Sequence, residues 1–137
     1  MRIVLGFDGS PVARLALERA ASLAGPGGHV AVVSALPTES PFLRPGIPFD
    51  EEDVAEQRRE LDGAGALLRE RGVEHSLLDP VGDPAETLCE VARERVADLI
   101  VVGSHGRGAA ARALLGSVSS SVVHHAPCDV LVVRLPG

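Results

Sequence analysis

Five short runs rich in Val, Ile and Leu recur along this 137-residue chain, separated by stretches of helical periodicity. The runs are 2–7, 29–36, 73–79, 99–102 and 129–134. A strand with one solvent-exposed face alternates apolar and polar residues, and most of these runs lack that alternation. They are therefore typical of strands that are buried on both faces of a parallel sheet. Glu74, His75 and Ser76 interrupt the third run, which therefore predicts a strand at a sheet edge.

Four helices are expected between these strands. They cover approximately residues 11–24, 50–72, 84–96 and 117–125. Ser10 can cap the first helix and Asp83 the third, each with a proline directly after it. Apolar residues at helical spacing place Val54 on the buried side of the second helix and Val96 on that of the third.

Strands that alternate with helices predict a doubly wound α/β sandwich with a mostly parallel sheet. The length suits one hydrophobic core, so we expect a single domain over residues 1–137. The core must consist of Val, Leu, Ile and Ala, because the only aromatic residues are three phenylalanines.

Composition excludes several classes of protein. The net charge of −6 opposes general nucleic-acid binding, because the phosphate backbone would be repelled. All thirteen basic residues are arginine, which excludes a Walker-type phosphate loop and Schiff-base chemistry, since both need a lysine. The chain has no apolar run of membrane-spanning length and no secretory signal, so we expect a cytoplasmic protein without a membrane partner.

The stretch after the fourth strand has the composition of an anion site. Glycine recurs there at Gly103, Gly106, Gly108 and Gly116. Glycine lets backbone amides approach an anion closely and allows positive φ, and the helix expected from Ser117 directs its first amides at the same place. Ser104, Ser117 and Val118 lie in this stretch, and Arg107, with Arg112, can offset phosphate charge.

Other strand ends can complete a ligand site with this stretch. In open α/β sheets, ligands bind beyond the carboxyl ends of the strands where the strand order reverses. Asp8, Gly9 and Ser10 follow the first strand, and Asp8 suits a ribose hydroxyl or a metal-bound water. Ala35 ends the second strand, and Val81 and Gly82 follow the third; all of these residues are candidates for nucleotide binding.

The spacing Gly103-x-x-Gly106, nine residues, Gly116-Ser117 resembles the G-2x-G-9x-G-[S/T] signature of the ATP-binding branch of the universal stress protein family. Segments 3–10, 81–84 and 127–133 are similar to other parts of that family. The resemblance implies a strand order of 3-2-1-4-5, as in adenine nucleotide alpha hydrolase-like folds. It also implies ATP with its adenine near Asp8, Ala35 and Val81-Gly82, and phosphates on Gly103, Gly106, Gly116 and Ser117.

The same resemblance implies Mg²⁺ or Mn²⁺ among the phosphates, with no direct protein ligands. We expect no catalytic residue: His105 is more typical of a residue that orders the loop by hydrogen bonding. A nucleotide-dependent regulatory or stress-response protein is therefore the preferred interpretation. Slow metal-dependent ATP hydrolysis and a nucleotide-free dimeric interaction module are the alternatives.

The last strand predicts a homodimer. Val130, Leu131, Val132 and Val133 are apolar on both faces, and the implied strand order places them at a sheet edge, where an unpaired apolar strand favours association. Pairing across a two-fold axis would cover that edge, and the family resemblance implies dimers of this kind.

Overall fold

The computed structural model describes residues 1–36, 51–105 and 115–136, and helices alternate with strands along them. The elements are β1 (Arg2–Gly6), α1 (Pro11–Ala24), β2 (His29–Val33), α2 (Glu51–Glu70), β3 (Glu74–Leu78), α3 (Pro84–Glu94), β4 (Leu99–Gly103), α4 (Ser117–His125) and β5 (Asp129–Val133). Each expected strand and helix is confirmed, with ends that shift by a few residues.

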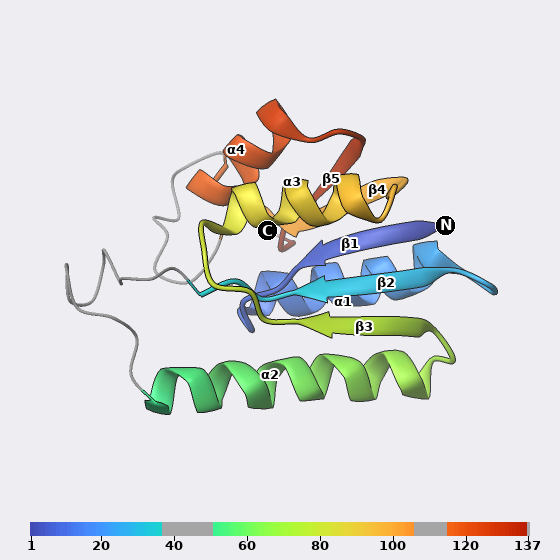
Figure 1. Ribbon diagram of the computed structural model, residues 1–137. Coiled ribbons are helices and arrows are strands. Elements are labelled where there is room, and N and C mark those ends of the chain that lie inside the picture. The colour runs from blue at the N-terminus through green and yellow to red at the C-terminus, as the bar shows by residue number, and fades with distance from the viewer. Residues whose placement is uncertain (37–50, 106–114, 137) are drawn as a thin grey trace.

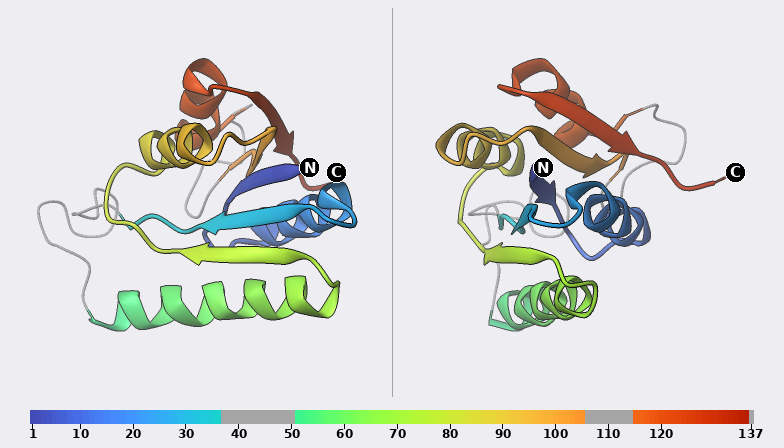
Figure 2. Two further views of the ribbon diagram at one scale, coloured as in Figure 1. Left: turned by 45° about the vertical axis from the view of Figure 1, so that its right-hand side comes forward. Right: turned by 90° about the vertical axis from the view of Figure 1, so that its right-hand side faces the viewer.

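The strands form one parallel sheet of order β3-β2-β1-β4-β5. α1 and α2 lie on one face of the sheet, and α3 and α4 lie on the other (Figures 1 and 2). The doubly wound sandwich and its strand order are thus confirmed. From β1 the chain proceeds through α1 to β2, whereas from β4 it proceeds through α4 to β5 in the opposite direction, so the switch point lies between β1 and β4.

The polar residues predicted to begin two helices do so. The Ser10 hydroxyl accepts a hydrogen bond from the amide of Ala13 at 3.2 Å, and Asp83 accepts one from the amide of Glu86 at 2.9 Å. Each satisfies an amide that has no partner inside the first helical turn. With these caps, α1 and α3 each begin one short turn after the ends of β1 and β3.

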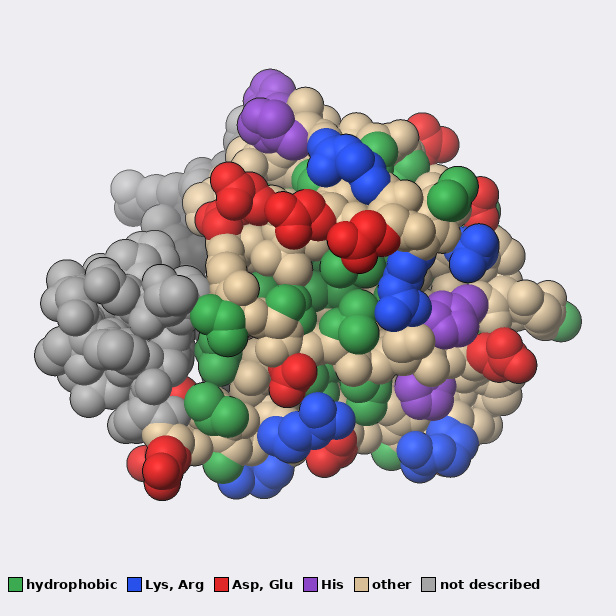
Figure 3. All heavy atoms as spheres, in the orientation of Figure 1, with side chains coloured by type: hydrophobic (Ala, Val, Ile, Leu, Met, Phe, Trp, Pro, Cys, Tyr) green, Lys and Arg blue, Asp and Glu red, His purple; other side chains and the backbone are tan. Residues whose placement is uncertain are grey.

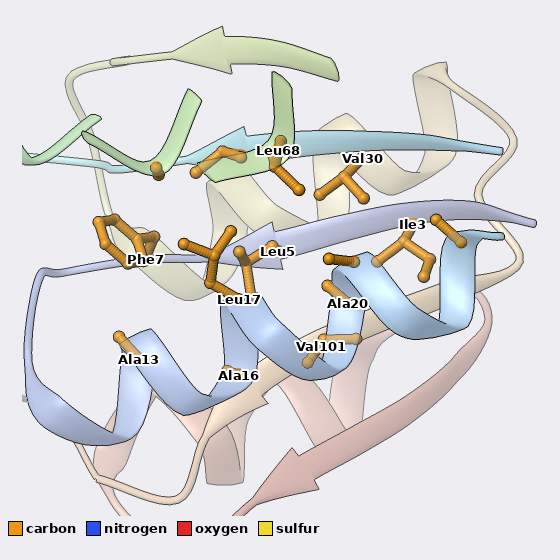
Figure 4. Close-up of a cluster of buried hydrophobic side chains, with 14 of the residues drawn as sticks. Ile3, Leu5, Phe7, Ala13, Ala16, Leu17, Ala20, Val30, Leu68 and Val101 are labelled. Atoms are coloured by element: carbon orange, nitrogen blue, oxygen red, sulfur yellow. The ribbon is translucent and has the colours of Figure 1, made fainter. Parts of the chain in front are cut away.

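Buried aliphatic side chains fill both faces of the sheet. On the first face, Ile3 and Leu5 of β1 meet Leu17 and Ala20 of α1, and all four are 3% exposed or less (Figure 4). A second cluster under α3 and α4 includes Val4, Ile100, Leu88 and Val122. Burying a Val or Leu side chain stabilises a fold by about 1.5–3 kcal/mol.

Two residues predicted to face the core do not. Val54 is 48% exposed because α2 lies along the β3 edge and buries only a narrow stripe around Leu61 and Leu68. Val96 is 73% exposed because α3 ends at Glu94 and the chain turns through a left-handed conformation, φ 51°, at Val96.

The α3 side of the sheet is unevenly covered. α3 lies in front of β1 and β4, while none of the described helices lies in front of β2 and β3 (Figure 1). In the same view, apolar side chains occupy the middle of this face and charged side chains surround them (Figure 3). Within the described ranges, no helix combines the length and apolarity that crossing a membrane requires.

Candidate functional site

A cavity of about 150 Å³ lies at the switch point of the sheet. β1 and β4 are neighbours, with Leu5 opposite Val101, so their carboxyl ends lie side by side. Asp8 and Ala35 line the cavity together with Gly103 and Val118. The structure therefore brings together Asp8 and Ala35, which follow β1 and β2, and Gly103, which ends β4.

The turn after β1 forms one wall of the cavity. The Asp8 carboxylate accepts a hydrogen bond from the amide of Ser10 at 3.0 Å, and Gly9 between them has φ 76°. Phe7, just before the turn, donates its amide hydrogen to the carbonyl of Val33 at 2.9 Å. These bonds hold the turn between the end of β1 and the start of α1.

The chain after β2 contributes Ala35 to a second wall, and the turn after β3 lies beside this chain, although Val81 and Gly82 are not among the residues that line the cavity. Leu36 pairs with Val81 as an isolated parallel bridge, and the amide of Gly82 donates to the carbonyl of Leu36 at 3.0 Å. The backbone of Gly82 has φ 149°, and the side chain of Val81 is 70% exposed. Leu36, the residue after Ala35, thus holds Val81 and Gly82 close to Ala35 through its backbone.

The third part of the site is the start of α4. The helix begins at Ser117 with Gly116 as its N-cap, and no side chain caps it. The amide of Gly116 donates to the carbonyl of Ser104 at 2.6 Å. This bond brings the start of α4 to the end of β4, and unpaired amides in the first turn of a helix favour an anion.

Ser119 is a supporting residue that was not predicted. Its buried hydroxyl donates to the carbonyl of Ser104 at 2.9 Å and lies 3.2 Å from the carbonyl of Gly116. A serine in the first turn of the expected helix is the only sequence signal for this role. The sequence does not show which side of that turn faces the end of β4, so the contact between Ser119 and Ser104 could be identified only in the structure.

Gly103 and Gly116 were expected to allow positive φ and a close approach of backbone amides to an anion. The positive φ is not found, because Gly103 lacks the left-handed backbone and Gly116 has φ −75°. A Cβ on Gly103 would lie 2.8 Å from Cγ1 of Val12 in α1. Gly103 therefore allows α1 to pack closely against the end of β4. Among the described glycines, Gly9 and Gly82 have positive φ and lie next to the strand ends that form the cavity.

Several predicted features lie outside the described residues. They are Gly106, Arg107, Gly108 and Arg112, together with the proline-rich stretch 37–48. His105 is described, and its Nδ1 lies 3.2 Å from the Ser104 hydroxyl, as expected of a residue that orders the loop. Among the described residues, no group of three or more His, Cys, Asp or Glu side chains could hold a metal ion.

Fold and cavity define a doubly wound α/β protein with a pocket at the switch point of its sheet. The family model named "Universal stress protein family" matches residues 1–134. The chain belongs to the universal stress protein family.

Three known proteins illustrate the similarity. A universal stress protein of Thermus aquaticus, described as lying in the QAH/OAS sulfhydrylase 3' region, is 38% identical over 135 residues, covering 96% of this chain and 97% of the relative. The Archaeoglobus fulgidus universal stress protein, solved in complex with dAMP, is 28% identical, with a TM-score of 0.77 and 97% of each chain covered. Another universal stress protein, solved in complex with cAMP, is 29% identical, with a TM-score of 0.74, covering 98% of this chain and 96% of the other.

Proposed function

We propose that this protein binds ATP at the switch point of its sheet and acts as a nucleotide-dependent regulatory protein in a stress response. The cavity lined by Asp8, Ala35 and Gly103, and by Val118 in the first turn of α4, carries this proposal. The dAMP and cAMP complexes of two relatives that share the fold support an adenine nucleotide as the ligand class.

The parts of the site suit the parts of a nucleotide. A cavity of about 150 Å³ is smaller than the roughly 300–1,000 Å³ of a typical small-molecule site, so it suits the base and ribose rather than a whole nucleotide. Asp8 can accept a hydrogen bond from a ribose hydroxyl, and Ala35 and Val81 offer apolar contact to a base. The phosphates would then extend toward Gly116, Ser117 and the amides of α4.

Mg²⁺ or Mn²⁺ is proposed as a companion of the phosphates. The donor set fits an ion that is held mainly by the nucleotide, because the described residues offer no cluster of metal-ligating side chains and Ser117 offers an exposed hydroxyl. When bound, the ion would neutralise phosphate charge in a protein whose net charge is −6.

We also propose a single domain, a cytoplasmic location and a homodimer formed through β5. In the described sheet β5 pairs only with β4, so its outer edge is available to a second copy. The proposed contact consists of Val130, Leu131, Val132 and Val133. Pairing of two such strands would remove the exposed edge from both copies.

Calorimetric titration with ATP, ADP, AMP and cAMP, with and without Mg²⁺, tests the proposal. We expect ATP with Mg²⁺ to bind most tightly and to raise the melting temperature. Asp8→Ala should weaken binding. Asp98→Ala is the matched control, since Asp98 lies at the opposite end of the strands, where it accepts a hydrogen bond from the amide of Arg2. Absence of both heat and thermal stabilisation at millimolar ATP would contradict the proposal.

A further inference from the structure

The helix α2 contacts two backbone segments, at Ser34 and at Gly9, whose neighbouring residues line the cavity. Gln57 and Glu60 lie three residues apart, and side chains with this spacing share one side of a helix. Gln57 reaches the chain just after β2, and Glu60 reaches the turn after β1. One helix thus contacts both of the backbone segments beside which the proposed function places the base and the ribose.

The contact of Gln57 is a buried hydrogen bond. Its Nε2 donates to the carbonyl of Ser34 at 2.6 Å and lies 3.3 Å from the Ser34 hydroxyl. Gln57 and Ser34 are both 7% exposed, so water does not compete freely for these groups. Ser34 lies between Val33 and Ala35, which both line the cavity. Gln57 therefore holds the segment that carries this wall.

The contact of Glu60 is a close packing against Gly9. A Cβ on Gly9 would overlap the Glu60 carboxylate, since it would lie 2.7 Å from Oε1 and closer still to the other carboxyl atoms. Gly9 and Glu60 both line a groove of about 740 Å³ between α1 and α2, whereas Asp8 lines the nucleotide cavity. Glu60 consequently contacts the turn at Gly9 from this groove, while the neighbouring Asp8 lines the cavity.

The phosphate side of the site is held by different elements. There the carbonyl of Ser104 accepts hydrogen bonds from Gly116 and Ser119, which belong to the start of α4. On the base side, the hydrogen bonds of Gln57 reach the backbone and hydroxyl of Ser34. The described supports of the two halves therefore come from different helices, α4 and α2.

We infer that Gln57 and Glu60 are positioning residues that set the base and ribose half of the nucleotide site, and that they leave the phosphate half unaffected. This inference rests on the proposed function. Removing the Gln57 amide leaves the buried acceptors of Ser34 without their donor, which favours movement of the wall. Removing the Glu60 side chain leaves the Asp8–Ser10 turn without its contact at Gly9.

The test compares ATP with inorganic tripolyphosphate, both with Mg²⁺, by calorimetry on the full chain. Gln57→Met keeps the side-chain volume and removes the hydrogen-bond donor. It should lower the affinity for ATP on the order of tenfold, while the affinity for tripolyphosphate stays at the wild-type value. Glu60→Ala should show the same split, and Glu60→Gln, which keeps the packing, should restore ATP affinity. Arg69→Ala, exposed in the last turn of α2, is the matched control and should change neither affinity.

The outcomes separate the two claims. If the wild-type protein binds no adenine nucleotide, the proposed function fails and this inference fails with it. If the wild type binds ATP but Gln57→Met and Glu60→Ala keep full ATP affinity, or weaken ATP and tripolyphosphate equally, only the inference is overturned. A loss that is also constant across ATP, ADP and AMP supports it, because those ligands share base and ribose and differ in phosphates.

Discussion

The hydroxyl group of Ser119 donates a hydrogen bond of 2.9 Å to the carbonyl oxygen of Ser104, fifteen residues earlier in the chain. The same oxygen accepts the amide of Gly116 at 2.6 Å. One backbone carbonyl therefore joins the end of β4 to the first turn of α4, where we place the phosphates.

Ser119→Ala should weaken this junction. Loss of the hydroxyl removes one of the two described hydrogen bonds to the Ser104 carbonyl and should lower the free energy of unfolding by about 1 kcal/mol. Urea denaturation measures this loss, and calorimetry should show weaker ATP binding as the start of α4 becomes less well placed. Ser121→Ala is the control, because its described contact is made by the backbone carbonyl. Equal behaviour of both variants would contradict the role of Ser119.

Gly103→Ala should destabilise the protein through a clash with α1. The new Cβ would lie 2.8 Å from Cγ1 and 3.2 Å from Cγ2 of Val12, and such overpacking costs about 1–3 kcal/mol. Val12→Ala removes those two methyl groups. In a double-mutant cycle, the two substitutions together should be less destabilising than the sum of their separate effects. Strict additivity in thermal or urea denaturation would show that the close approach is unimportant.

His29 should make stability depend on pH. Partial burial lowers the pKa of His29 from 6.5, the charge of Arg95 lowers it further, and Glu74 opposes the shift; Arg2 and His75 add smaller lowering effects. The Ser76 hydroxyl lies 3.1 Å from His29 Nε2 and accepts from Arg95 at 3.2 Å, so its own proton can be donated to neutral His29. Arginine and histidine side chains are visible together near this end of the sheet (Figure 3).

The direction follows from proton linkage. As pH falls below 6.5, the unfolded chain takes up a proton at His29 before the folded protein does. The free energy of unfolding therefore decreases between pH 6.5 and the lower pKa of His29 in the folded protein. Urea denaturation from pH 8 to pH 5 and NMR titration of the His29 ring measure both quantities. His29→Gln should flatten the pH dependence, and an NMR pKa above 6.5 would reverse the expected sign.

Val132→Asp should dissociate the proposed homodimer. A charge on β5 opposes the approach of a second apolar edge, so sedimentation should change from twice the chain mass of 14.2 kDa to the monomer mass. Val123→Asp is the control, because Val123 is an apolar residue 48% exposed on α4. Circular dichroism confirms that both variants are folded, and a folded Val132→Asp dimer would exclude this interface.

Periodicity and helix caps predicted the helices, the strands and the doubly wound class, whereas the strand order came from the family resemblance. The Val-rich runs predicted the strands, Ser10 and Asp83 marked helix starts, and polar Glu74 and Ser76 indicated the β3 edge. Val54 and Val96 were placed wrongly, because periodicity reports a helical face without showing how far the neighbouring sheet extends or where the helix ends.

The candidate site was predictable where residues directly follow strands. Asp8, Ala35 and Gly103 meet because the carboxyl ends of parallel strands share one edge of the sheet. The supports from distant helices were not predictable, because Gln57 and Ser119 are ordinary polar residues until tertiary packing brings them to Ser34 and Ser104.

Filling the cavity is the most direct test of where the nucleotide binds. Ala35→Leu adds bulk at the cavity lining, whereas Ala97→Leu adds the same bulk to a small pocket at the opposite end of the strands. Calorimetric titration with ATP and Mg²⁺ should show binding to the wild type and to Ala97→Leu and a large loss for Ala35→Leu. Equal ATP affinity of the two variants, or absence of binding by the wild type at millimolar ATP, would contradict the account.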